Sequence, residues 1–353
     1  MNSIGQFAVR ISDFDYQLPE ELIAQRPLKE RDASRMLVIN RTTGSFEDQQ
    51  FISLPDYVQA GDCLVLNNTR VFPARLSGRR IPTGGSVEIL LLDEIESGKW
   101  QVLARPARRL QAGSRIEFGD SKLTATVVEV LEEGVRIIAF DPCRDVTGII
   151  EQIGVTPLPP YIRRVSGAAP EDRDRYQTVY AQQRGAIAAP TAGLHFTPAV
   201  LRELKENHVR VAEITLHVGY GTFEPVRVDD IAQHRVLSER FTITREAASV
   251  INECRRTGGR VVAVGTTTTR ALESSVSEAG EILAANGVAD LTITPGYKFR
   301  AVDALLTNFH LPRSSLLLLV SAFGGRDLML GAYRHAVCAR YRFYSYGDCM
   351  LIL

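Results

Sequence analysis

The sequence predicts an α/β core that carries an inserted small all-β barrel, giving two domains. At 353 residues the chain is long enough for two domains of ordinary size. Strand-like apolar runs alternate with helical patterns towards both ends of the chain, whereas the middle holds only short strand-like runs. We therefore expect residues 1–69 and 156–353 to form a discontinuous α/β core with the active site, and residues 70–155 to form the barrel.

The first core segment mixes short helix and strand patterns. LPEELIAQ, at 18–25, predicts a short helix that ends before Pro27, because proline cannot continue a helix interior. RMLVIN, at 35–40, and DCLVLN, at 62–67, have the apolar character and length of buried strands.

The middle segment contains six runs rich in valine, isoleucine and leucine, separated by glycine-containing turns. The runs are ARLSGRR, SVEILLLDEI, KWQVLARP, SRIEFG, KLTATVVEVL and VRIIAF. Their regular spacing, without helical periodicity, is typical of a small barrel or sandwich. Because α/β patterns resume afterwards, we interpret the segment as an insertion. The Pro-rich stretch at 155–177 predicts a linker or return crossing.

The second core segment alternates strands and helices. It opens with Thr197 and Pro198, a good N-cap and first-turn pair for a helix at 198–207. The expected elements after it are a strand at 209–219, a helix at 245–257, a strand at 260–265, a helix at 269–280, the runs LTITPG and DALLTNFH, a helix from Pro312, a helix at 326–340 and a last strand near 347–353. This alternation predicts a largely parallel sheet with helices on its faces.

Charge is balanced, with 41 basic and 41 acidic residues and a net charge of zero. That balance argues against a protein that coats itself in nucleic acid. Nearly all the basic residues are arginines, clustered at 75–80, 105–109, 163–164 and 340–342. Codon bias is the simpler explanation of the overall excess, whereas the clusters indicate an anionic partner, since arginine suits bidentate phosphate contacts.

Cysteine usage and the chain's start indicate a cytoplasmic protein. The five cysteines lie far apart without a C-x-x-C pair, which favours a reducing compartment over a disulfide framework or a zinc site. No signal-peptide pattern opens the chain, and the longest aliphatic run, LLLLV, is far shorter than a membrane span. Neither H-E-x-x-H nor D-x-D-x-D-G occurs, so we expect no metal.

Polar residues follow three of the predicted strands, in HVGYGTFEPV (217–226), GTTTTR (265–270) and TNFHLPRSS (307–315). Ligands of open α/β sheets bind beyond the carboxyl ends of strands. Each stretch has a structural alternative, because glycines serve tight turns and a histidine at a strand end is more often a satisfied structural residue. Together the three stretches are harder to explain as structural, and they mark where we expect a ligand to bind.

The four consecutive threonines are more than helix capping requires, because a cap needs one residue. At a strand end that opens a helix, backbone N–H groups and several hydroxyls converge on an anion. Arg270 adds charge, and no G-K-[ST] follows, so this is not a P-loop. The stretch predicts a site for a small anionic or zwitterionic group.

Eight segments, taken in chain order, resemble motifs of the S-adenosylmethionine:tRNA ribosyltransferase-isomerase family of queuosine biosynthesis. They are DFDYQLPEELIAQRPLKERDASRML, LNNTRVFPARL, APTAGLHFTP, ITLHVGYGTFEPVR, HRVLSERF, VGTTTTRALES, TNFHLPRSSLLLLVSAF and YRFYSYGDCMLI. The resemblance runs from about residue 13 to 352 and is looser in the barrel. Cys349 stands where a small residue such as alanine is expected, and Tyr220 occupies a variable position.

The resemblance implies a reaction in which S-adenosylmethionine donates its ribosyl moiety to 7-aminomethyl-7-deazaguanine at the wobble position of tRNA. The products are epoxyqueuosine in tRNA, adenine and methionine. It also implies a cytoplasmic enzyme with an α/β core and an inserted barrel, with S-adenosylmethionine as co-substrate and no metal or prosthetic group. We expect a monomer without membrane contact. The alternatives are an S-adenosylmethionine-dependent tRNA methyltransferase and a non-catalytic RNA-binding protein.

This chemistry needs a general base for the carbon beside the sulfonium and an acid for departing adenine. The expected catalytic residues are His217 and His310, followed by His195, His234 and Asp348. The expected substrate-binding residues are Gly219, Gly221, Thr222, Glu224, Glu239, Thr266, Thr267, Thr268, Thr269, Arg270 and Asn308. Glu273 is a further candidate for a ribose hydroxyl, with a structural role as its alternative.

Recognition of a single-stranded anticodon loop calls for aromatic stacking and arginine contacts to phosphate. The expected tRNA-binding residues are Asn67, Asn68, Arg70, Arg105, Arg108, Arg109, Arg340, Arg342, Tyr344 and Tyr346. Core packing is an equally good explanation of the tyrosines, and turn formation of the asparagines.

Overall fold

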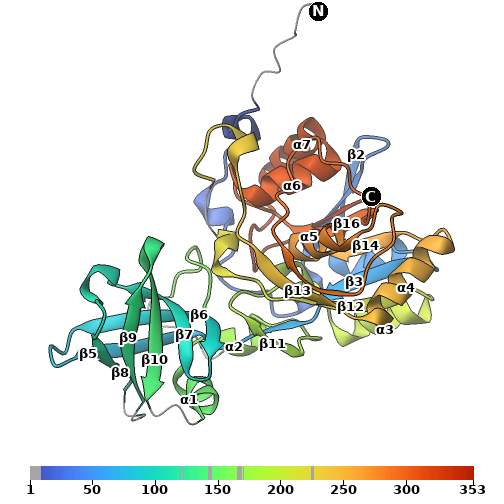
Figure 1. Cartoon of the computed structure of the whole chain (residues 1–353). Helices are drawn as coiled ribbons and strands as arrows, with labels where there is room; N and C mark the ends of the chain where they lie inside the picture. Colours follow the sequence, from blue (N-terminus) through green and yellow to red (C-terminus); the bar gives the residue numbers. More distant parts are fainter. Residues whose placement is uncertain are drawn as a thin grey trace, which may run out of the picture.

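The structure is a computed structural model that describes residues 9–119, 121, 123–141, 145–164, 169, 171–223 and 226–353. A nine-stranded sheet with helices on both faces forms the core, and a closed six-stranded barrel lies beside it (Figure 1). The predicted fold class, an α/β core with a small barrel, is confirmed.

The large sheet is mixed, so the prediction of a largely parallel sheet is wrong. Its strands, in spatial order, are β15 (Ala285–Ala289), β13 (Glu239–Ile243), β12 (Arg210–Leu216), β3 (Cys63–Asn67), β14 (Val261–Val264), β16 (Ala304–Asn308), β17 (Cys349–Ile352), β1 (Arg35–Asn40) and β2 (Ser45–Gln50). The central strands β12, β3, β14 and β16 are parallel, whereas β13, β15, β17 and β2 each have an antiparallel neighbour.

The connections explain the antiparallel pairs. Between β16 and β17 the chain forms two helices in succession, α6 (Ser315–Gly324) and α7 (Arg326–Cys338), so it enters β17 at the same end of the sheet at which β16 finishes. No α-helix separates β12 from β13 within the described residues, and β13 returns directly alongside β12. A single crossover helix, which would give a parallel pair, is missing in both connections.

Alternate strand residues pack into two layers. Val261 and Ala263 of β14 contact the apolar cluster under α4 (Arg245–Arg256), α5 (Thr266–Ser275), α6 and α7. Val262 and Val264 contact the cluster under α3 (Pro198–Glu206) on the other face. A strand buried on both faces is a continuous apolar run, which is why VVAV was predictable.

Several helix limits differ from those expected. Thr197 caps α3 as predicted, accepting from Val200 N at 3.3 Å. The helix expected at 18–25 is only a three-residue 3-10 turn, Glu20–Leu22, because the chain then extends and pairs with the backbone of Phe343. α5 begins at Thr266, so all four threonines are helical. The LTITPG run holds no strand, and β15 lies just before it.

Each of the six apolar runs of the middle segment contains one barrel strand. The strands are β5 (Arg75–Ile81), β6 (Ser86–Glu96), β7 (Lys99–Arg105), β8 (Arg115–Glu117), β9 (Thr124–Val130) and β10 (Val135–Asp141), closed in the order β10-β7-β6-β5-β8-β9. α1 (Val146–Ile153) follows and packs Val146 and Ile150 into the barrel's apolar interior. A short parallel ribbon of β4 (Thr69–Val71) and β11 (Gln183–Ala186) lies at the junction, and α2 spans Asp172–Arg175.

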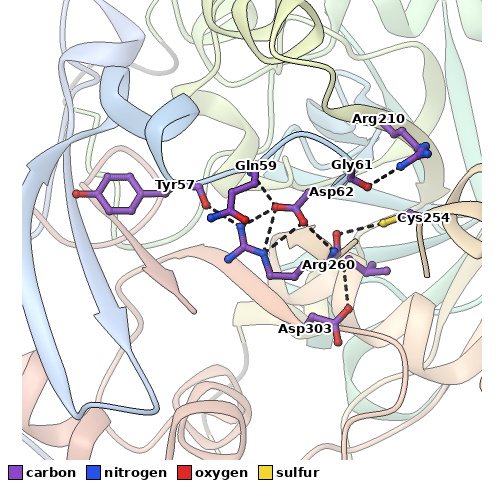
Figure 2. A network of polar contacts seen from close by, with 9 residues as sticks. Tyr57, Gln59, Gly61, Asp62, Arg210, Cys254, Arg260 and Asp303 are labelled. Atoms are coloured by element: carbon purple, nitrogen blue, oxygen red, sulfur yellow. Dashed lines mark hydrogen bonds and ion pairs between the residues drawn. The ribbon is translucent and has the colours of Figure 1, made fainter. Parts of the chain in front are cut away.

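A polar network joins the amino-terminal ends of the parallel strands (Figure 2). The Asp62 carboxylate accepts from Arg260 N at 2.8 Å, from Arg260 Nη2 at 2.6 Å and from Gln59 N at 2.9 Å. Arg210 Nη1 donates to the carbonyl of Gly61 at 2.6 Å, and Asp303 accepts from the first residue of β14 at 2.8 Å. These contacts fix where the strands begin, and therefore align their carboxyl ends.

Within the described residues no single helix is long and apolar enough to cross a membrane. Only α6 and α7 together reach that length and composition, as a pair bent by 116°.

Candidate functional site

A cavity of about 460 Å³ opens at the carboxyl ends of β14 and β16. Thr266 and Thr267 line it from the start of α5, and Asn308 and His310 line it from the end of β16. A smaller hollow of about 100 Å³ adjoins it, and Thr266 and Thr267 border both. Gly219, the residue that follows Val218, lines this hollow. The three polar strand ends predicted from the sequence therefore meet at one place.

The start of α5 is built by a glycine turn. Gly265 has φ of 95°, a backbone conformation that L side chains rarely adopt, and it lines the cavity together with Thr266 and Thr267, so α5 begins at the cavity wall. The four threonines then divide into two pairs. Thr268 and Thr269 are fully buried and donate back to the carbonyls of Val264, at 2.7 Å, and Gly265, at 3.2 Å. Thr266 and Thr267 face the cavity instead.

His310 is buried in the cavity wall. Its Nε2 lies 3.0 Å from Thr307 Oγ1, and its backbone N–H donates to the Tyr333 hydroxyl at 3.0 Å. Tyr16 donates its hydroxyl proton to the His310 carbonyl at 2.5 Å. Burial lowers the pKa of His310 to about 3, so the imidazole is neutral at neutral pH.

Asn308 is held with its amide in one orientation. Its Nδ2 donates to the carbonyl of Tyr344 at 3.0 Å and lies 3.3 Å from His195 Nε2. Because an amide nitrogen only donates, His195 Nε2 accepts and the imidazole proton sits on Nδ1, which lies 2.7 Å from Ser34 Oγ. Burial lowers the pKa of His195 to about 3, which keeps it neutral. Asn308 Oδ1 is buried and has no hydrogen-bond partner among the described residues.

The guanidinium of Arg270 donates its hydrogen bonds to protein groups. Nη1 pairs with Glu239 Oε2 at 2.5 Å, and the other nitrogens donate to the carbonyls of Leu237, Ala289 and Leu291 at 2.6 to 3.2 Å. The other oxygen of Glu239 accepts from Gly219 N at 3.0 Å. Arg270 and Glu239 thus brace the wall of the smaller hollow and the turn after β12.

The chain matches the queuosine biosynthesis protein family over residues 11–352. The chain belongs to this family.

Two curated relatives carry the name S-adenosylmethionine:tRNA ribosyltransferase-isomerase. The one from Halothermothrix orenii is 49% identical and the one from Symbiobacterium thermophilum 51% identical, each over 98% of this chain and 100% of its own length. A crystal structure of S-adenosylmethionine tRNA ribosyltransferase from Thermotoga maritima is 40% identical, with a TM-score of 0.55 over 97% of this chain and 100% of that chain.

The other predicted histidines of this queuosine biosynthesis protein lie outside the main cavity. His217 Nδ1 is 2.9 Å from Thr69 Oγ1, next to Arg240, and burial followed by the Arg240 charge lowers the pKa of His217. His234 Nε2 lies 2.7 Å from Ser315 Oγ, on the rim of the smaller hollow, and burial lowers the pKa of His234.

The predicted acidic residues have mainly backbone partners. Asp348 accepts from Arg35 N at 3.0 Å and Arg342 N at 2.8 Å, away from both cavities, and burial raises the pKa of its carboxyl. Glu273 accepts from three successive backbone N–H groups, 300–302, and from the Tyr297 hydroxyl. Gly221 lines the smaller hollow. Glu224 and the side chain of Thr222 lie outside the described residues.

The residues predicted to bind tRNA divide by exposure. Arg70, Arg105, Arg108, Arg109 and Arg340 are exposed. Asn67 and Asn68 are buried, and their amides bond to β12: Asn67 to Leu216 at 3.0 Å and Asn68 to Thr215 at 2.7 Å. Tyr344 and Tyr346 are also buried, and Arg342 is half-buried.

Tyr161 lines the main cavity and is absent from the predicted set. Its ring lies 4.2 Å from that of Tyr344, centroid to centroid, and its hydroxyl is 2.6 Å from Ser345 Oγ. The sequence predicts a linker or return crossing for the segment around it, 155–177. An aromatic residue directly after Pro159 and Pro160 was the available indication that this segment packs against the core.

Proposed function

We propose that this chain transfers and isomerises the ribosyl moiety of S-adenosylmethionine onto 7-aminomethyl-7-deazaguanine at the tRNA wobble position, releasing adenine and methionine. One observation carries the proposal: the three polar strand ends meet at a 460 Å³ cavity in a member of the queuosine biosynthesis family. The full-length similarity to enzymes named for this transfer supports it.

The start of α5 suits the methionine carboxylate. Unpaired N–H groups and the positive end of a helix dipole favour an anion there, and Thr266 and Thr267 add hydroxyl donors. Arg270 contributes indirectly, since its charge is already paired with Glu239. We therefore assign substrate contact to the first two threonines and a positioning role to Arg270.

His310 is our choice for the proton transfers. It is the one predicted catalytic histidine whose side chain belongs to the residues lining the main cavity. Burial keeps its imidazole neutral, which is the form that a general base requires. Such a group takes a proton from the carbon beside the sulfonium and passes it to departing adenine. His217, His195, His234 and Asp348 then act on neighbouring structure rather than on substrate.

Asn308 and the tyrosine pair suit a purine-like base. The free Oδ1 of Asn308 accepts from an exocyclic amine, which both adenine and the deazaguanine carry. Tyr161 and Tyr344 offer ring faces at the cavity wall for stacking. The exposed arginines at 105, 108 and 109 on the barrel offer contacts to tRNA phosphates. The proposal places a monomer in the cytoplasm, with S-adenosylmethionine as co-substrate and no prosthetic group.

Adenine release tests the proposal. Purified protein is incubated with S-adenosylmethionine and tRNA bearing the 7-aminomethyl-7-deazaguanine base, and adenine is followed by chromatography. Release that requires the modified base, and is absent with guanine at the wobble position, is the expected result. S-adenosylhomocysteine in place of adenine would show a methyltransferase, and no product from folded protein would leave only a binding function.

A further inference from the structure

A second hollow lies behind His195, on the side away from Asn308. Three arginines line it: Arg31 from the turn before β1, Arg175 from α2, and Arg342 from the stretch before β17. No carboxylate belongs to its lining among the described residues. We refer to these three arginines and the space between them as the arginine hollow.

The three guanidinium groups bond only to backbone carbonyls. Arg31 donates to Leu194 O at 3.1 Å and Asp174 O at 3.0 Å. Arg175 donates to Lys29 O at 3.0 Å and Leu28 O at 2.6 Å. Arg342 donates to the carbonyl of Arg26. None of the three makes an ion pair with a described residue, and Asp174 and Asp348 act on Arg31 and Arg342 only from further away.

Two donors of the hollow lack acceptors. Arg175 Nε and Arg342 Nη1 are buried and have no hydrogen-bond partner among the described residues. Buried donors left without acceptors are costly, and charged ones more so. The charges also disfavour one another: burial and then Arg175 lower the pKa of Arg31, and burial lowers the pKa of Arg342. Asp348 is the carboxyl whose charge acts on Arg342, and it already accepts hydrogen bonds from two backbone N–H groups. An anion in the hollow relieves both costs.

We infer that the arginine hollow binds a phosphate of the tRNA backbone next to the modified nucleotide. Three arginines from separate elements around one hollow suit the several oxygens of a phosphate, because arginine is well matched to phosphate contacts. The hollow adjoins the main cavity, because Ser345 lines both and His195, which lines the hollow, contacts Asn308, which lines the cavity. A base that enters the cavity brings its own flanking phosphates to this neighbourhood. The inference rests on the proposed function, since it takes the ligand to be tRNA.

Equilibrium tRNA binding tests the hollow. The variants are Arg31→Gln and Arg175→Gln, and Arg256→Gln is the control, because Arg256 lies exposed on α4 and pairs only with its neighbour Glu253. Affinity for tRNA is measured by fluorescence anisotropy at several salt concentrations, and affinity for S-adenosylmethionine alone by calorimetry. We expect the two variants to lose about tenfold in tRNA affinity and about 0.7 to 0.9 in salt slope, with unchanged S-adenosylmethionine binding. Unchanged tRNA affinity and slope in folded variants would overturn the inference.

A second arm uses the wild-type protein, so it holds even where the variants do not fold. Anticodon stem-loops carry an uncharged methylphosphonate at one position at a time. Loss of affinity and salt slope at a single position beside the wobble nucleotide is expected, and equal effects at all positions would exclude a specific phosphate site. Inorganic phosphate that raises the wild-type Tm at constant ionic strength, with no position-specific loss, would instead show a site for free anion. Adenine release is scored separately: failure there with the phosphate effect intact overturns the reaction but not the site.

Discussion

The Asn308 carboxamide and the His195 imidazole lie side by side, with Nδ2 3.3 Å from Nε2. On its other side the His195 ring contacts Ser34, whose Oγ lies 2.7 Å from His195 Nδ1, so the three side chains form a buried chain of hydrogen bonds. Because each member fixes the proton position of the next, the contacts leave Asn308 Oδ1 as the amide's unpartnered acceptor. We therefore propose that His195 orients Asn308.

Replacing Asn308 with aspartate should lower kcat/KM for adenine release by about 10- to 100-fold, the size of one lost buried hydrogen bond to a charged or polar group. The new carboxylate oxygen would face the carbonyl of Tyr344 and the lone pair of His195 Nε2, both acceptors. Asn207→Asp, on the exposed end of α3, is the control. Steady-state kinetics that match the wild type would contradict the assigned orientation.

Thr267→Val should raise the KM for S-adenosylmethionine by about 5- to 10-fold, because it removes one hydroxyl donor from the carboxylate site. Thr268→Val is the matched control. Its hydroxyl bonds to Val264 O at 2.7 Å inside the protein, so that variant should lose about 1 kcal/mol of stability and keep its KM. If the two variants shift the KM equally, the division of the four threonines into two pairs is wrong.

Burial on both faces decides which strands the sequence reveals. β14 is apolar at every position because both sides pack against helices, whereas β2, SFEDQQ, is exposed along most of its length at the sheet edge and shows no apolar alternation. The direction of β17 depends on the two helices before it, and a local pattern of strand and helix does not carry that information. The barrel was predictable because burial alternates along its strands and short glycine-containing turns separate them.

The strand ends located the site, but not the partners of its residues. Arg270 and Glu239 are 31 positions apart, so the sequence alone gave no sign that the charge of Arg270 is compensated. Asp348 likewise bonds Arg35, 313 positions away. Arg31 and Arg175 meet only because α2 packs against the turn at Arg31–Ala33. Long-range pairing of this kind separates residues that touch substrate from residues that hold the fold.

Acid should destabilise the folded chain through His195 and His310. Each has a folded pKa of about 3 against an ordinary value of 6.5, so between these values the unfolded chain binds a proton that the folded chain does not. Above about pH 6.5 both states leave the two histidines neutral, so they cost no stability. Below that pH the free energy of unfolding falls by up to about 1.4 kcal/mol per pH unit per histidine as the pH drops towards 3. Urea unfolding at pH 7, 6 and 5 measures the slope. His310→Gln should lower it by about one proton, and an unaltered slope would show that His310 is not buried in neutral form.

Asp62→Ala should lower the free energy of unfolding by about 2–3 kcal/mol, somewhat less than a fully buried pair, because the Arg260 side chain is 32% exposed. The network in Figure 2 then loses the carboxylate that holds the start of β14 against β3. Glu253→Ala removes an exposed pair with Arg256 and should cost less than about 1 kcal/mol. At 25 °C the KM for S-adenosylmethionine should stay unchanged, and a raised KM would show that this network also shapes the cavity.

The barrel should contribute to tRNA binding through charge alone. Arg105, Arg108 and Arg109 lie exposed at the end of β7 and in the turn that follows, and none of them lines the cavity. Replacing all three with glutamine should weaken tRNA binding by about 5- to 10-fold at moderate salt and reduce the salt slope by up to about 0.9 per lost phosphate contact. Adenine release at saturating tRNA should keep its rate, since no substrate contact changes. Arg115→Gln, exposed on β8 outside the cluster, is the control. A triple variant with the wild-type salt slope would exclude the barrel cluster from the tRNA interface and leave recognition to the residues around the cavity.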